Sequence, residues 1–108
     1  MAKDKSIKGK WLPIEYYVPD YIQSRYATNL LVQNTEHEFI LSFFELQEPF
    51  LMGDTPEERE QQVEQLKYVR AKCVGRVIIT ADRMPAFVDA MQKNLEKHRA
   101  RFDETEEG

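Results

Sequence analysis

Cysteine, glycine and long apolar runs are all scarce in this chain. A single cysteine, Cys73, among 108 residues excludes an internal disulfide and a cysteine-based zinc site, and this favours a reducing compartment. The four glycines lie far apart, so no glycine-rich phosphate loop is present. No run approaches the about 18 apolar residues of a membrane span. Residues 1–10 lack the apolar core of a signal peptide. We therefore expect a cytoplasmic protein that does not enter a membrane.

The residues that usually carry catalysis or bind metal are equally sparse. The two histidines, His37 and His98, fall in a predicted turn and near the end of a predicted helix, which is too few ligands for a metal site. None of the three serines, Ser6, Ser24 and Ser42, has the sequence context of a nucleophile elbow. We predict that the protein is not an enzyme, with no catalytic residue, no metal and no cofactor.

Charge is unevenly distributed along the chain. The total is −4, yet four lysines against one aspartate give the first ten residues +3. Residues 54–64 carry five acids against one arginine, and residues 103–108 carry four acids and no cation, so each segment is −4. The two charged ends predict a disordered basic arm at 1–10 and a disordered acidic tail at 103–108, around one α+β domain at 11–102. An acidic total argues against general nucleic-acid binding, which depends on neutralising phosphates.

The central predicted strand, residues 38–46, is apolar on both faces. Side chains alternate across a strand, so each face of the sheet receives three large apolar residues and needs cover. One face carries Phe39, Leu41 and Phe43, and the other carries Ile40, Phe44 and Leu46.

The residues around this strand predict an antiparallel sheet of three or four strands. Tyr26 to Gln33 forms a hairpin with the central strand through the turn at 34–37. A third strand spans Val69 to Thr80, where Gly75 indicates a bulge or a close backbone approach. Residues 11–18, limited by two prolines, are expected at the sheet edge or as an extended segment.

Two helices complete the prediction. The shorter, at 56–66, begins with a Thr55 cap, Pro56 in the first turn and Glu58 in a capping box, and should be peripheral. The longer, at 83–102, is capped by Asp82 and has Pro85 in its first turn. Its apolar residues recur every three or four positions, which predicts packing across one face of the sheet.

The third strand also has two unlike faces. Cys73 falls on its apolar face, which predicts an inert core thiol. The other face alternates basic and apolar residues, and arginine among apolar side chains is typical of a protein interface. That face comprises Arg70, Lys72, Val74, Arg76, Ile78 and Thr80.

The composition and pattern favour a non-enzymatic protein-binding or assembly module. We expect a homo-oligomer, a dimer or a dimer of dimers, whose exposed apolar sheet face or edge also takes up another protein. The predicted interface residues are Ile40, Phe44, Leu46, Val74, Arg76 and Ile78.

Two other functions stay open. A nucleic-acid-associated regulator would use Arg70, Lys72, Arg76 and the N-terminal lysines at 3, 5, 8 and 10. A small-molecule carrier would use an aromatic cluster, but this cluster lacks convergent polar groups and ranks last. The cluster consists of Trp11, Tyr16, Tyr17, Tyr21 and Tyr26.

Several short motifs resemble a family of small bacterial proteins classified only as a domain of unknown function. They lie within residues 24–102 and are Tyr26-Ala27 with Asn29 and Val32, Glu38-Phe39 with Leu41 and Phe43, Arg76-Val77-Ile78-Ile79-Thr80, and Asn94-Leu95 with Phe102. The resemblance implies no activity, cofactor or catalytic residue. Relative to that family, residues 52–67 look like an insertion. The order of strands and trailing helix is also similar to the SecB export-chaperone fold, an analogy of fold alone.

Overall fold

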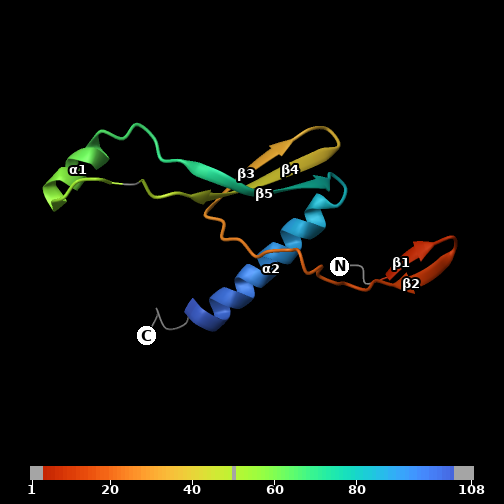
Figure 1. Ribbon diagram of the computed structural model, residues 1–108. Coiled ribbons are helices and arrows are strands. Elements are labelled where there is room, and N and C mark those ends of the chain that lie inside the picture. Colours follow the sequence, from red (N-terminus) through yellow and green to blue (C-terminus); the bar gives the residue numbers. More distant parts are fainter. Residues whose placement is uncertain (1–3, 50, 104–108) are drawn as a thin grey trace. The chain divides into compact units, whose positions relative to one another are not determined.

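The computed structural model describes residues 4–49 and 51–103, and it has the α+β architecture that the sequence predicts. Within these described ranges, five strands and two helices follow one another in the order β1 β2 β3 β4 α1 β5 α2 (Figure 1). The strands form a two-stranded sheet, β1–β2, and a three-stranded sheet in the order β3–β4–β5. The chain divides into two compact units. One contains residues 1–24 and 80–108, and the other contains residues 25–79.

The first unit begins with a hairpin. Strands β1 (Asp4–Ile7) and β2 (Lys10–Pro13) pair antiparallel, with Ile7 opposite Lys10. The two-residue turn has positive φ angles at Lys8 (52°) and Gly9 (78°), the combination of a type I′ turn whose twist suits a hairpin. Residues 4–10 therefore differ from the disordered arm expected at 1–10, because this turn allows two four-residue strands to pair. Residues 1–3 lie outside the described residues.

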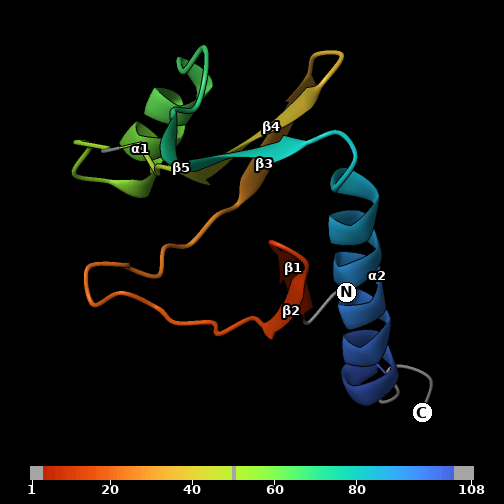
Figure 2. The ribbon, with the colours of Figure 1, turned by 90° about the vertical axis from the view of Figure 1, so that its right-hand side faces the viewer.

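The long helix of the first unit, α2 (Met84–Phe102), begins one residue later than expected. Its N-cap is Arg83, which makes no side-chain cap bond, so the expected capping by Asp82 is wrong. A turn replaces the cap, since the Arg83 N–H donates to the Thr80 carbonyl oxygen at 3.0 Å. Pro85 lies in the first turn as predicted. Figure 2 shows the helix along its length.

The second unit is built on the β3–β4 hairpin. Strands β3 (Asn29–Asn34) and β4 (Glu38–Leu46) pair antiparallel, with Leu31 opposite Ser42 and Val32 opposite Leu41. At the turn, the Thr35 N–H donates to the Glu38 carbonyl oxygen at 2.9 Å, and the Thr35 hydroxyl accepts from the Glu38 N–H at 3.2 Å. The predicted span of the central strand and its turn are confirmed.

β3 begins at Asn29, three residues later than predicted, and Thr28 continues the pairing with its side chain. The Thr28 N–H donates to the Phe44 carbonyl oxygen at 2.8 Å. The Thr28 hydroxyl then accepts the Leu46 N–H at 2.9 Å, where a regular strand would offer a backbone carbonyl. This hydroxyl therefore satisfies the last amide of β4.

Strand β5 (Ala71–Thr80) lies beside β4 and completes the three-stranded sheet. The strand is unbroken across Gly75, and a Cβ atom built there would meet none of the described atoms within 4 Å, so the expected close backbone approach is not present. Residues 14–28 have no strand or helix, and β2 pairs with β1. The segment 11–18 therefore provides no edge strand to the three-stranded sheet.

Helix α1 (Pro56–Glu64) follows β4 and precedes β5 in the sequence. Hydrogen bonds connect it to the loop that precedes it. Thr55 is the N-cap and accepts the Glu58 N–H at 3.2 Å, as predicted. Glu58 reaches back to accept the Asp54 N–H at 2.8 Å, and Gln62 accepts from Met52 and Gly53 at 2.9 and 3.2 Å. The helix buries no residue, which agrees with its predicted peripheral character.

Candidate protein-interaction face

One hydrogen bond establishes which residues share a face of the β3–β4–β5 sheet. The Arg76 Nε–H donates to the Ser42 hydroxyl at 3.0 Å, so these side chains lie on the same side of neighbouring strands. Because side chains alternate along a strand, Val74 and Ile78 share the side of Arg76. Leu31 joins them, since it pairs directly with Ser42.

The apolar residues on this side, together with Ser42 and Arg76, are here called the open face; Asn29, Gln33, Lys72 and Thr80 also lie on this side. The open face contains all six residues that the sequence predicts as interface, together with two that it does not. Its members are Leu31, Ile40, Ser42, Phe44, Leu46, Val74, Arg76 and Ile78.

Large apolar side chains of the open face are exposed. Leu31 is 60% exposed, Ile78 58% and Leu46 48%, while Ile40, Phe44 and Val74 are half-buried. Ser42 is the exception, because it is only 3% exposed beside the Arg76 side chain. Exposed apolar side chains around one satisfied polar pair are typical of an interface core.

The opposite face of the same sheet holds the two buried apolar residues of the described chain. Leu41 and Ile79 are each 5% exposed, and both alternate with open-face neighbours. Around them on that face, Leu30, Val32 and Val77 are 46–48% exposed, less than Leu31 and Ile78 on the open face. This difference makes the open face the candidate site.

Leu31 and Ser42 are the open-face residues that the sequence prediction missed. The register of the predicted hairpin contained the signal for Leu31, because alternation in 29–34 places it on one face with Gln33. The burial of Ser42 had no signal in the sequence, since it depends on the Arg76 side chain of another strand.

The residues predicted to matter least for metal binding or reactivity, His37 and Cys73, can be placed in the structure. Among the described residues, no group of three or more histidine, cysteine and acidic side chains lies close enough together to hold a metal ion. His37 stands in the β3–β4 turn at 3.7 Å from Glu36, with both side chains more than four-fifths exposed. Cys73 is exposed, so the expected inert core thiol is wrong for the single chain. Its thiol donates to the Gly75 carbonyl oxygen at 3.5 Å.

The basic residues that a nucleic-acid-associated regulator would use are distributed over two sheets. Arg76 and Lys72 belong to β5 and Arg70 precedes it, whereas Lys5, Lys8 and Lys10 belong to the β1–β2 hairpin and its turn. Lys3 lies outside the described residues. Arg76 already donates to Ser42, so part of its guanidinium is engaged within the protein.

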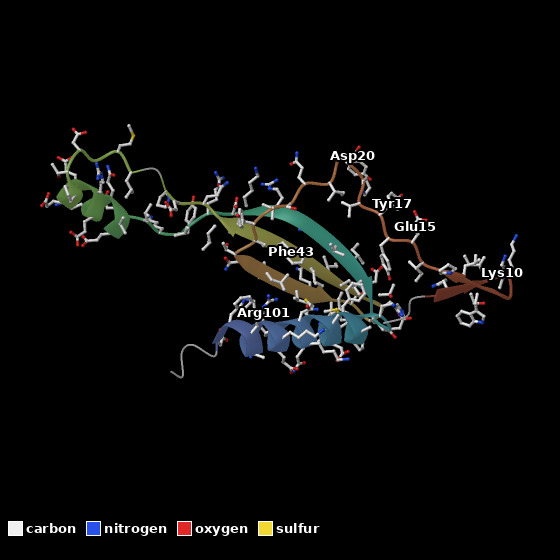
Figure 3. The ribbon with its side chains drawn as sticks, turned by 90° about the horizontal axis from the view of Figure 1, so that it is seen from below. Lys10, Glu15, Tyr17, Asp20, Phe43 and Arg101 are labelled. Carbon is white, nitrogen blue, oxygen red and sulfur yellow. The ribbon has the colours of Figure 1, made fainter. Side chains whose placement is uncertain are left out.

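The aromatic residues of the carrier alternative are all strongly exposed. Their exposed fractions run from 72% for Trp11 to 84% for Tyr26, whereas a binding pocket encloses most of its ligand. Tyr17, labelled in Figure 3, lies on the irregular segment between β2 and β3. These residues provide no enclosed site.

Comparison with known proteins finds a match to a family model. The model of a family described as "Protein of unknown function (DUF3467)" matches residues 1–107. No curated protein and no solved structure matches the chain. Within the described residues, neither helix is long and apolar enough to cross a membrane.

Proposed function

This chain belongs to the DUF3467 family, whose description names no activity, and we propose that it is a non-enzymatic assembly module that forms a homo-oligomer through its open face. The observation that carries the proposal is the exposure of Leu31, Leu46 and Ile78 on one face of the sheet. Exposed apolar patches of this kind in soluble proteins usually mark interaction sites.

A second copy of the chain is the occupant that the open face fits best. Two-fold pairing of identical surfaces is the commonest way to close a soluble oligomer. The open face carries one arginine among apolar residues, and the Arg76 side chain already meets Ser42. Two copies could therefore bury their apolar centres together without leaving a buried hydroxyl unpaired.

Phe44→Asp tests the proposal. Phe44 lies half-buried within the open face. Replacing it with a charged residue should separate the copies, because fully burying one phenylalanine side chain contributes about 1.5–3 kcal/mol. Light scattering should give a particle mass lower than that of the wild type, and circular dichroism should show that helix α2 is retained.

Val63→Asp is the matched control. Val63 is 50% exposed on α1, outside the open face, so the same charge introduced there should leave the particle mass unchanged. A wild type that is a strict monomer at high micromolar concentration would contradict the proposal. So would a Phe44→Asp variant that keeps the wild-type mass.

Nucleic-acid association is the alternative, and the same protein can test it. Titration with labelled DNA and RNA at low and moderate salt should show no tight binding, because the chain has a net charge of −4. Tight binding that weakens steeply with salt, and that is lost when Lys5, Lys8 and Lys10 are replaced together by Gln, would favour the regulator instead.

A further inference from the structure

The outer edge of β3 is an unprotected strand edge. β3 pairs with β4 on one side only, and no other strand of the described chain pairs with it. All six of its residues are exposed, and the strand contains neither a charged residue nor a proline. Natural edge strands usually carry such residues to prevent pairing with another chain.

Backbone groups on this edge are free to pair. The Thr35–Glu38 hydrogen bond at the turn means that hydrogen-bonded pairs recur at every second residue, through Gln33 and Leu31. The intervening residues, Leu30, Val32 and Asn34, therefore direct their N–H and C=O groups away from β4. The edge offers three donors and three acceptors in the arrangement that an antiparallel strand requires.

We propose that the β3 edge pairs antiparallel with the β3 edge of a second copy, centred on Leu31, so that the two sheets become one continuous sheet. A two-fold axis through Leu31 places each outward-bonding Leu30 opposite Val32 of the other copy. The same axis places Asn29 opposite Gln33. Apolar residues thus face apolar residues and amides face amides, which makes the edge complementary to itself.

The other free edge of the sheet, on β5, fits this role less well. β5 carries Lys72 and Arg76, so two β5 strands side by side would bring four cations together. β3 has no such repulsion. The β3 pairing is made by backbone groups at the strand edge, whereas the open-face contact is made by side chains on the surface of the sheet. It deepens the proposed function by supplying the second interface that a dimer of dimers needs.

Disulfide trapping tests the register directly. In a Cys73→Ser background, Leu31→Cys should form a covalent dimer on mild oxidation, because residues at the two-fold axis would have Cα atoms about 4.5 Å apart. Gln33→Cys is the control. Gln33 is exposed like Leu31, but the two Gln33 positions would lie about 13 Å apart along the strands.

A second variant blocks pairing at the β3 edge without changing the charge of the chain. Val32→Pro deletes only an outward N–H, which an edge strand tolerates, and should reduce the particle mass by a factor of two. Leu31→Cys should still be trapped in the Phe44→Asp background, where the open-face contact is removed. These variants therefore distinguish a missing contact at the β3 edge from a missing contact at the open face.

Two results would overturn the edge pairing. One is an oligomeric protein in which Leu31→Cys remains uncrosslinked or crosslinks no better than Gln33→Cys. The other is a folded Val32→Pro variant with the wild-type mass, the fold being checked by amide signals of β4 and β5.

Discussion

The Arg76 Nε–H donates a 3.0 Å hydrogen bond from β5 to the Ser42 hydroxyl on β4. Ser42 is the only buried polar residue among the described residues, and this bond satisfies its hydroxyl. Ser42 is 3% exposed, whereas the arginine that satisfies its hydroxyl is exposed. The bond thus ties the orientation of β5 to the hydroxyl of a buried residue.

Loss of Arg76 should destabilise the protein more than loss of Ser42. Arg76→Met leaves the buried hydroxyl without its partner and should lower the free energy of unfolding by about 1–3 kcal/mol. Ser42→Ala removes the group itself and should cost less. In a double-mutant cycle by urea denaturation at fixed protein concentration, adding Ser42→Ala to Arg76→Met should recover part of the loss. Strictly additive effects would contradict this pairing.

The Thr28 hydroxyl should be needed at the end of β4. Thr28→Val keeps the shape of the side chain but removes the acceptor of the Leu46 N–H, so the free energy of unfolding should fall by about 1 kcal/mol. Hydrogen exchange at the Leu46 amide should accelerate in the same variant. Thr28→Ser retains the hydroxyl and should behave like the wild type. Equal exchange in both variants would refute this role.

Gly53 and Gly75 should respond oppositely to alanine. A Cβ at Gly53 would lie 2.7 Å from the Glu58 Cβ and 2.9 Å from the Arg59 backbone nitrogen, so Gly53→Ala should loosen the first turn of α1. Gly75→Ala meets no described atom within 4 Å and should be neutral or stabilising by about 0.5–1 kcal/mol, because glycine weakens a strand interior. Limited proteolysis at α1 and thermal unfolding of both variants measure the two effects. Faster cleavage with Gly75→Ala than with Gly53→Ala would contradict the expectation.

The β1–β2 turn should become more stable with asparagine at position 8. Lys8 has a φ of 52°, a conformation that asparagine adopts more readily than lysine, and Asn-Gly is the preferred type I′ turn. Lys8→Asn should therefore increase the strand character of residues 4–13 in NMR chemical shifts. Gly9→Val, at a φ of 78°, should abolish it. Unchanged shifts in Gly9→Val would show that this hairpin does not depend on the turn.

Local patterns in the sequence were sufficient for elements whose signals lie within a few residues of each other. Strand 38–46 followed from its alternation and the turn before it, and α1 followed from the Thr55–Pro56–Glu58 start. The shorter sequence patterns of the first hairpin were not sufficient to predict it. The four-residue strands of the first hairpin carry little apolar pattern, and the Lys8–Gly9 turn is a weak form of its motif.

The amino-acid sequence by itself determined the α+β class and the span of β4, and it supplied the six residues that we predict as interface, because strand alternation and helix caps act between near neighbours. Only the tertiary structure decided that those six residues share one face, since this depends on the alignment of β5 with β4 that the Arg76–Ser42 bond records. It likewise decided that Leu41 and Ile79 are buried while Leu31 and Ile78 are exposed. Strand pairing between distant segments sets burial, and alternation within one strand identifies two faces without specifying which of them is covered.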